Sequence, residues 1–553
     1  MASPQKRVVI LGGGFAGVYT AMYLERALPK SMRDQVEISL VSRENYIVFQ
    51  PLLPEVVSGS IELLHAISPI RRLVRQTRLY SREIQNIDLD EKTIHLFPGC
   101  RPQTATIRYD HLVIGLGTQL DYSRVPGMRE HSIPFRYLGD ALRLRNHLVN
   151  TLEEADNETD PENRRELLTF VVAGGGFSGV ECIAEMNDLL RSAIKAYRNI
   201  QEDDLTFILL QSGDRILPEM EEDLAGFAHR ILQNRGVEIR LRTRMTAVTA
   251  TSALSRAKDS DQTEAIPTRT VVATVPSGPH PLLAELDCEK RRGRIAVDRQ
   301  LRLLHREGVW AVGDCAFIPT TDRYDDESDP GSPPTAQHAL RQAKTCAQNI
   351  AASLQGKELK TFSFAGLGKL GSLGRMSAVA SVMGVKVSGV LAWILWRAIY
   401  VSKMPGLDRK IRVLFDWLLD WMLPRDIAEL RIFQPDSVIR EHFERGQFVF
   451  DQGDFGDKVY FIVDGKAEII IDGKVIDTLE TGQTFGEIAL YQDQPRRAAV
   501  RAATPLDCVT VSRAAFENLL AHVPGVADAI STIVKSRLDG PKSAEAAIGT
   551  TEP

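Results

Sequence analysis

The chain has 553 residues, of which 44% are hydrophobic and 25% charged, and its formal net charge is -5. This length allows about three or four domains, and the small net charge gives no indication of nucleic-acid binding. Six scattered cysteines without a CxxC pair favour a reducing compartment and argue against a disulfide framework or a dithiol active site. The N-terminus runs directly into a predicted strand, so we expect no signal peptide, and we expect no metal site.

A glycine-rich turn follows the first predicted strand, at residues 8–11. Its residues are Gly12, Gly13, Gly14, Phe15, Ala16 and Gly17, and a helix-like stretch comes next. In such a unit the first glycine allows a tight turn and the second lets backbone amides approach a pyrophosphate. The third glycine lets the helix pack on the strand, so that the helix N-terminus faces the negative charge. The pattern predicts a Rossmann-like domain over residues 1–120, which ends at a buried strand (112–114) and a turn at Gly117.

The same pattern occurs a second time after the apolar residues 170–173. The second turn consists of Gly174, Gly175, Gly176, Phe177, Ser178 and Gly179. It predicts another Rossmann-like domain over residues 121–290, in which the Ser-, Asp- and Thr-rich residues 252–268 form a loop at a hairpin tip. Two dinucleotides bound by one chain usually mean a flavin facing a nicotinamide. The α/β fold expected is therefore that of a two-dinucleotide-binding flavoprotein.

The chain then returns to the first domain over residues 291–360. The apolar run 308–312 ends at Gly313 and Asp314, and a polar, proline-rich loop (321–334) precedes a helix that begins near residue 335.

Residues 361–430 have the character of an amphipathic membrane anchor. The apolar run 387–396 has only half of the about 20 residues that a membrane-spanning helix needs. Beyond it, apolar residues recur at helical spacing and charged residues fall on the opposite face. Tryptophans and basic residues on such a helix suit the bilayer interface. The alternative is a helix pair that packs on the protein's own core or on a dimer partner. The apolar face comprises Ile411, Leu414, Phe415, Leu418 and Trp421, the charged face Arg409, Arg412, Asp416 and Asp420, and the tryptophans are Trp393, Trp396, Trp417 and Trp421.

Short β runs broken by glycine turns follow from about residue 432. They predict a separate jelly-roll-like β-barrel domain over residues 431–540, with a helical end at 513–538, and a flexible tail at 541–553.

Residues 6–430 resemble the type II NADH dehydrogenases, single-subunit flavoproteins that pass electrons from NADH to membrane quinone. The resemblance rests on both glycine turns and on the motifs FQPLLP (49–54), GVE (179–181), GD (313–314) and TAQHA (335–339). It implies FAD in the first domain, NADH in the second and quinone as the electron acceptor. It also implies a C-terminal membrane anchor, a homodimer, and a peripheral location on the cytoplasmic face of a bacterial inner membrane.

The resemblance assigns roles to single residues. Asp314 would accept hydrogen bonds from flavin ribityl hydroxyls, and Glu181 would lie near the nicotinamide–flavin contact; a helix-start role for Glu181 is the alternative. Gln337 would offer a donor and an acceptor to a quinone carbonyl. The family pattern has a second Gln four residues later, where this chain has Arg341 followed by Gln342. The predicted FAD contacts are Gly12, Gly14, Phe15, Ala16, Gly17, Arg43, Glu44, Gly117, Asp314 and Ala336, and the predicted NADH contacts are Gly174, Gly176, Phe177, Ser178, Gly179 and Gln211.

An acidic residue normally ends the second strand of each nucleotide unit and binds the ribose hydroxyls. The first unit has Ser42 and Arg43 there, with Glu44 as a possible substitute, and the second has Gln211 and Ser212. Without that carboxylate, repulsion against a 2′-phosphate is removed. We therefore expect the preference for NADH over NADPH to be relaxed.

The C-terminal domain resembles the cyclic-nucleotide-binding domains of the catabolite-activator and kinase-regulatory type. The resemblance rests on FGEIAL (485–490) and PRRAAV (495–500). Arg496 would pair with the cyclic phosphate and Glu487 would accept from the ribose 2′-hydroxyl, and cAMP is favoured over cGMP. A degenerate barrel without a ligand is the alternative. The predicted contact residues are Gly486, Glu487, Ala489, Arg496, Arg497 and Ala498.

Two rival functions stay open at this point. One is another two-dinucleotide flavoprotein, such as a sulfide:quinone or ferredoxin reductase, although the isolated Cys182 and Cys315 suit sulfide chemistry poorly. The other is a redox and cyclic-nucleotide sensor, which would bind NADH and yet reduce quinone negligibly.

Overall fold

The computed structural model describes residues 5–99, 103–274, 277–321, 328–430, 438–491 and 494–522. The chain forms two compact units, residues 1–94 with 108–431 and residues 95–107 with 432–553. The predicted tail (541–553), the end of the predicted C-terminal helix (523–538) and part of the predicted loop 321–334 lie outside the described residues.

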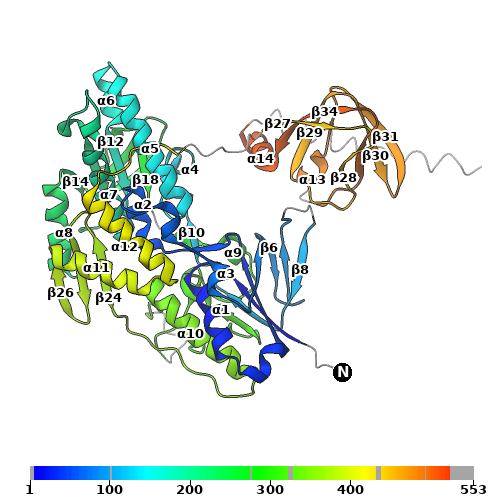
Figure 1. Cartoon of the computed structure of the whole chain (residues 1–553), viewed down its shortest axis with the longest axis horizontal. Helices are drawn as coiled ribbons and strands as arrows, with labels where there is room; N and C mark the ends of the chain where they lie inside the picture. The colour runs from blue at the N-terminus through cyan, green and yellow to red at the C-terminus, as the bar shows by residue number, and fades with distance from the viewer. Residues whose placement is uncertain are drawn as a thin grey trace, which may run out of the picture. The chain divides into compact units, whose positions relative to one another are not determined.

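A five-stranded parallel sheet in the order β22-β9-β1-β2-β5 forms the first nucleotide domain. Its central strand is fully buried over residues 8–11, as the apolar run predicts. The pairing of β22 with β9 confirms the predicted return of the chain to this sheet. Helices α1 (Phe15–Ala27) and α10 (Ala336–Ser353) pack against each other (Figure 1). The strands are β1 Lys6–Leu11, β2 Val36–Ser42, β5 Arg78–Ser81, β9 His111–Ile114 and β22 Val309–Ala311.

A second five-stranded parallel sheet, in the order β11-β18-β12-β13-β14, forms the other nucleotide domain. Helix α7 (Phe177–Ala193) follows β12 through the second glycine turn, and α8 (Glu222–Asn234) precedes β14. Helix α5 (Leu138–Asn157) belongs to the same domain. The strands are β11 Ile133–Pro134, β12 Thr169–Ala173, β13 Thr206–Leu210, β14 Val237–Arg240 and β18 Thr270–Ala273.

The loop predicted at residues 252–268 is wrong, because most of this segment is strand. β15 (Thr243–Val248), β16 (Ser252–Ala257) and β17 (Glu264–Pro267) form an antiparallel sheet. Ala253 and Ser255 are buried, so side chains alternate inward and outward along β16. The outward polar residues hid this alternation, and only residues 258–263 connect the two strands as a loop.

The segment before the C-terminal domain forms a three-stranded antiparallel sheet and two helices. The strands are β24 Gly368–Ser372, β25 Ala378–Val382 and β26 Val385–Ser388, and the helices are α11 Gly389–Lys403 and α12 Leu407–Met422. Helix α12 covers the residues whose apolar positions recur at helical spacing. In the described part of the chain, no helix combines the length and apolar composition needed to cross a bilayer.

The C-terminal domain consists of two four-stranded antiparallel sheets, in the orders β27-β34-β29-β32 and β28-β33-β30-β31. The short β runs predicted from about residue 432 are strands of these two sheets, among them β29, β30, β31 and β34. Their inward-facing residues form one core that contains Tyr460, Phe485 and Leu506. The elements are β27 Val438–Phe443, β28 Phe448–Phe450, β29 Lys458–Asp464, β30 Lys466–Ile471, β31 Lys474–Glu480, β32 Thr484–Phe485, α13 Glu487–Tyr491, β33 Ala499–Ala502, β34 Leu506–Ser512 and α14 Arg513–His522.

Candidate active site

The first glycine turn joins β1 to the N-terminus of α1. Gly12 has φ +109°, which side chains rarely adopt, and a Cβ there would strike the carbonyl oxygen of Gly115. A Cβ on Gly17 would strike the carbonyl oxygen of Gly12. By contrast, nothing lies within 4 Å of a Cβ placed on Gly14 or on Gly117. The packing therefore requires Gly12 and Gly17, while Gly14 borders open space at the helix N-terminus, where a pyrophosphate fits.

The second glycine turn repeats this arrangement between β12 and α7. Gly174 has φ +115°, and a Cβ there would lie 2.6 Å from Oγ1 of Thr274. At Gly176, the only heavy atom that a Cβ would meet within 4 Å is Oε1 of Glu219, at 4.0 Å. This turn therefore also leaves room for the phosphates of a dinucleotide.

The turn that carries Asp314 lies against the first glycine motif. Gly313 donates its N–H to Oε1 of Gln342 (2.8 Å), and a Cβ on Gly313 would lie 2.8 Å from Cβ of Ala16. Burial raises the pKa of Asp314, while nearby Arg136 and Arg294 favour its charged form. The turn thus brings a carboxyl group beside α1, as the predicted FAD site requires. Gln342, the candidate second glutamine, has a structural role here.

The ends of β2 and β13 carry the predicted ribose-reading residues. Nε of Arg43 lies 3.2 Å from Oε1 of Glu44, and both side chains are exposed. Gln211 accepts the N–H of Gly175 (3.0 Å) and donates to the carbonyl of Arg215 (3.1 Å). Gln211 therefore lies against the second glycine turn, where the adenosine ribose of a bound dinucleotide would be read.

Glu181 lies just past the first turn of α7, which holds no acidic residue, and is buried. Its Oε1 accepts the backbone N–H of Ser372 on β24 (2.9 Å). Burial raises its pKa to about 8, although the bond from Ser372 favours the charged form. The carboxyl group is thus protonated at neutral pH and bonded to another element, which argues against a simple helix-start role.

Gln337, in the first turn of α10, is bonded to the other end of β24. Its Oε1 accepts the N–H of Leu367 (3.0 Å), and its Nε2 donates to the carbonyl of Gly368 (3.2 Å). Arg341 donates to the carbonyl of Gln337 (3.0 Å) and stacks 4.2 Å from the ring of Phe364. The structure therefore brings the two predicted catalytic residues to one strand and uses Arg341 to hold the helix turn.

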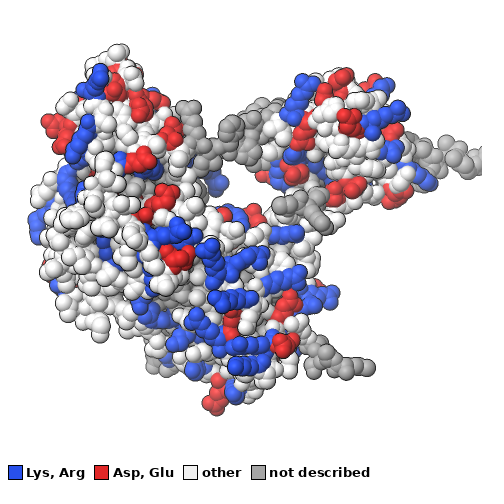
Figure 2. All heavy atoms as spheres, in the orientation of Figure 1, with Lys and Arg blue, Asp and Glu red and all other residues white. Residues whose placement is uncertain are grey.

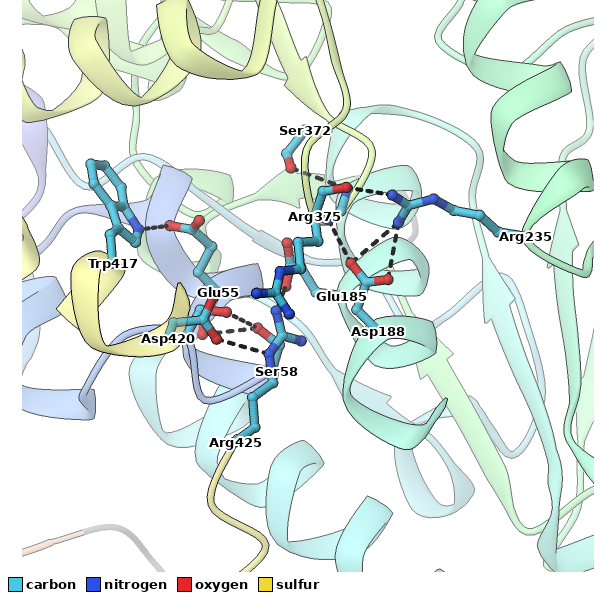
Figure 3. Close-up of polar contacts among 12 residues, drawn as sticks. Glu55, Ser58, Glu185, Asp188, Arg235, Ser372, Arg375, Trp417, Asp420 and Arg425 are labelled. Atoms are coloured by element: carbon cyan, nitrogen blue, oxygen red, sulfur yellow. Dashed lines mark hydrogen bonds and ion pairs between the residues drawn. The ribbon is translucent and has the colours of Figure 1, made fainter. Parts of the chain in front are cut away.

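Figure 3 shows a buried ionic cluster that was not predicted from the sequence. Glu55, on α2 (Leu53–Val57), accepts from Arg397 (3.1 Å) and from the indole N–H of Trp417 (2.9 Å). Arg425 pairs with Asp420 (3.0 Å) and lies 3.8 Å from Glu185. Burial raises the pKa of Glu185 to about 7 and raises that of Glu55. The two glutamates are far in sequence from the arginines that they face, so no local signal could have revealed these contacts.

Helix α12 buries Val413 and Trp417 in the core but leaves the rest of its apolar side chains exposed. Asp416 lies 2.6 Å from Nδ1 of His65 on the 3-10 turn Leu63–Ala66, and Asp420 is buried beside Arg425. Five apolar side chains are instead between 48% and 70% exposed: Ile411, Leu414, Phe415, Leu418 and Trp421. Trp396 and Trp417 are buried in the protein's own core, so only some of the tryptophans face outward.

The predicted cyclic-nucleotide residues lie together around α13. Arg496 is buried and donates to the carbonyl oxygens of Gly486 (2.5 Å) and Lys458 (2.8 Å). Its guanidinium lies 4.1 Å from the ring of Phe450. Glu487 and Ala489 are buried, Ala498 is half-buried, and Arg497 is exposed and donates to Gln494 (3.1 Å). In this structure backbone carbonyls hold the arginine that was predicted to bind phosphate.

Cys182 and Cys315 are the two cysteines considered for sulfide chemistry. Cys182 and Cys315 are buried, and burial raises the pKa of Cys315 to about 11 and that of Cys182 further. Such thiols are not available as the thiolates that sulfide chemistry needs. Within the described ranges, no group of three His, Cys, Asp or Glu side chains is placed to hold a metal ion.

Two parallel sheets, each with an open glycine turn at a helix N-terminus, define an oxidoreductase of the flavin and nicotinamide dinucleotide class. Residues 6–343 match the family described as pyridine nucleotide-disulphide oxidoreductase. Residues 367–426 match the NDH2 C-terminal domain, and residues 440–523 match the cyclic nucleotide-binding domain.

Similarity to known proteins shows to which family within this class the chain belongs. The type II NADH:quinone oxidoreductase Ndh of Mycobacterium tuberculosis is 30% identical over 453 residues, 79% of this chain and 93% of that protein. The demethylphylloquinone reductase NdbB of Synechocystis is 30% identical over 76% of this chain and 99% of that protein. NDH2 from Plasmodium falciparum in complex with NADH has the same fold, with a TM-score of 0.71 at 17% identity over 77% of this chain and 100% of that chain. The chain belongs to the type II NADH:quinone oxidoreductase family and carries a cyclic nucleotide-binding domain in addition.

Proposed function

We propose that this chain is a FAD-dependent, non-pumping NAD(P)H:quinone oxidoreductase that works on a membrane surface. The observation that carries this proposal is that Glu181 and Gln337 are bonded to one strand in a domain pair with two open glycine turns. Membership of the family supports the same conclusion.

The residues of the chain would bind and orient the two dinucleotides. FAD, when bound, would accept a hydride from the nicotinamide and pass two electrons to the quinone. The N-terminus of α1, with Gly14, would face the FAD pyrophosphate, and Asp314 would accept from the ribityl hydroxyls. The N-terminus of α7, with Gly176, would face the phosphates of NADH.

Glu181, expected near the nicotinamide–flavin contact, and Gln337 would both serve the reduction of the quinone. Because Oε1 of Glu181 accepts the N–H of Ser372, the proton that this carboxyl group holds below its raised pKa would lie on Oε2. That proton would be available to the quinone, which takes up protons as it is reduced. The amide of Gln337 keeps a second N–H and a second lone pair for a quinone oxygen.

The flavin spectrum of the purified full chain tests this function. We expect a bound flavin whose absorbance bleaches when NADH is added without oxygen and returns when a soluble quinone follows. A colourless protein that FAD does not reconstitute would refute the proposal. Bleaching by NADH with negligible quinone turnover would favour the redox sensor.

We propose that the outward face of α12 docks on a lipid surface. A helix that turns Asp416 and Asp420 toward the protein and exposes several apolar side chains to solvent suits the interface of a bilayer. Arg72 pairs with Asp408 (3.1 Å), which places α3 (Ile70–Leu73) beside α12. Figure 2 shows Lys and Arg gathering over α1 and α3, where they would attract anionic headgroups.

We propose cAMP as the ligand of the C-terminal domain, with a regulatory effect on the oxidoreductase. The cyclic phosphate would replace the two carbonyl oxygens that hold Arg496, and Glu487 would accept from the ribose 2′-hydroxyl. Calorimetric titration with cAMP tests binding, and we expect Arg496→Lys to weaken it about tenfold or more. Arg501→Lys, at an arginine paired with Glu468, is the control. Saturating cAMP that changed neither quinone reduction nor membrane binding would exclude regulation.

The homodimer and the location on the cytoplasmic face of a bacterial inner membrane stay predictions of the family resemblance. Sedimentation of the detergent-solubilised protein tests the dimer, and protease accessibility in oriented membrane vesicles tests the location.

A further inference from the structure

A hollow of about 420 Å³ lies beside Ser212 in the second nucleotide domain. Ser212 follows Gln211, the residue at the predicted ribose-reading position. Four cationic side chains and one carboxylate line it. The cations are Arg242, Arg244, Arg256 and Lys258, and the carboxylate is Asp261.

Backbone hydrogen bonds fix this hollow next to the end of β13. The N–H of Thr243 donates to the carbonyl of Gln211 (2.9 Å), and the N–H of Arg242 donates to that of Gly213 (3.0 Å). Gln211 in turn accepts from Gly175 of the glycine turn. In Rossmann folds the residue at the end of this strand reads the ribose 2′-hydroxyl of NAD, and a nearby arginine accommodates the 2′-phosphate of NADP.

The charges around the hollow favour an anion. Arg242 is paired with Asp259 (2.9 Å) and approaches Asp214 (3.4 Å). Among the residues that the structure describes, Arg244, Arg256 and Lys258 have no side-chain hydrogen bond or ion pair. A phosphate monoester could therefore engage these three cations while Arg242 keeps its carboxylate partners.

At the end of β13, Gln211 stands where an acidic residue would usually repel such a ligand. An acidic side chain at position 211 would repel a 2′-phosphate, whereas the amide of Gln211 is neutral and is held by the glycine turn. Guanidinium groups match phosphate oxygens in geometry as well as in charge.

We propose that Arg244, Arg256 and Lys258 form a 2′-phosphate site that makes NADPH a substrate of this enzyme. The proposal rests on the function proposed above, since it names the dinucleotide that the second domain uses. It goes further by assigning the selectivity to the β15–β16 hairpin, outside both glycine motifs.

The first test measures binding without turnover. In calorimetric titrations of the full-length flavoprotein, adenosine 2′,5′-bisphosphate should bind about tenfold or more tightly than 5′-AMP. The double variant Arg244→Gln/Arg256→Gln should abolish this difference, and Arg230→Gln, at an exposed arginine on α8, should keep it. Equal binding of both nucleotides to the wild type would overturn the proposal.

The second test measures turnover with both dinucleotides. The double variant should lower kcat/KM for NADPH about tenfold or more and change that for NADH less than about twofold. Gln211→Glu should shift preference toward NADH by restoring the acidic residue. Equal losses for both substrates in the double variant would contradict a 2′-phosphate site. A protein that used neither dinucleotide, yet bound the bisphosphate tightly, would refute the proposed function and support the site.

Discussion

Glu181 and Gln337 are hydrogen-bonded to opposite ends of the same five-residue strand, β24. One residue comes from the second nucleotide domain and the other from the helix that returns to the first. Within β24, a Cβ on Gly371 would lie 2.9 Å from the ring of Phe177, so the strand also packs against the start of α7. The strand therefore sets the positions of both groups that we assign to the quinone.

The raised pKa of Glu181 makes stability depend on pH. Its pKa is about 8 in the folded protein, whereas the ordinary value is 4.5. The stability that the protonated carboxyl group contributes is therefore complete below pH 4.5 and is lost as the pH rises to about 8. Wild type should lose stability relative to Glu181→Gln over this window, by at most about 1.4 kcal/mol per pH unit. Thermal unfolding at a series of pH values measures this. Glu222→Gln, at an exposed position of α8, should follow wild type throughout.

Replacing one glycine in each turn should weaken the binding of one dinucleotide and not of the other. Gly14 and Gly176 have extended backbones that alanine adopts, and an added Cβ meets no atom closer than 4.0 Å. Gly14→Ala should fold normally but lower the affinity for FAD about tenfold or more, because the methyl group enters the pyrophosphate space.

Gly176→Ala should keep its flavin and weaken NADH binding by a similar factor of about ten. Flavin content and the NADH concentration needed for bleaching are the two readouts. Gly139→Ala on α5, where a Cβ also meets nothing, is the matched control. Flavin loss in both site variants to the same degree would show that the turns do not act separately.

The pair Arg397–Glu55 should be sensitive to the loss of one partner. The two side chains are 15% and 3% exposed, so Arg397→Met leaves a buried carboxyl group with only the indole of Trp417. We expect a loss of about 3–5 kcal/mol in unfolding free energy. The double variant Glu55→Gln/Arg397→Met should recover part of that loss.

The exposed pair Arg72–Asp408 provides the comparison for this cycle. Arg72→Met should change stability by less than about 1 kcal/mol. A similar loss at both pairs would mean that burial does not control the effect.

The outward face of α12 should determine membrane binding. Replacing Phe415, Leu418 and Trp421 by Ser removes three exposed apolar side chains and should lower partition into anionic vesicles about a hundredfold or more. The flavin should stay bound. Val475→Ser/Ile476→Ser removes exposed apolar residues of the C-terminal domain and should leave partition unchanged. Vesicle sedimentation measures both variants.

The sequence predicted those parts of the protein in which one local pattern has one physical cause. Both glycine turns, the return at β22 and the strands of the C-terminal domain follow from hydrophobic runs and from glycines at turns. The site could be predicted only as far as Glu181, Gln337 and Asp314, to which the family resemblance assigned roles.

The remaining features depend on tertiary contacts. The bonds from β24 to Glu181 and Gln337 join segments that are far apart in sequence, and so do the contacts of Glu55 with Arg397 and Trp417. The predicted loop at 252–268 was wrong because the outward polar residues of β16 hid its alternation and because the inward-facing Ser255 is polar as well. The helical period of α12 identified its two faces, but only the structure shows which one is directed outward.

The outward face of α12 has a consequence for the newly made protein. Where no lipid covers it, the exposed apolar face of α12 is in contact with water. This exposure favours association of one copy of the protein with another through that face. Mild detergent should therefore disperse such clusters, and the Ser-substituted helix should not need detergent to remain dispersed.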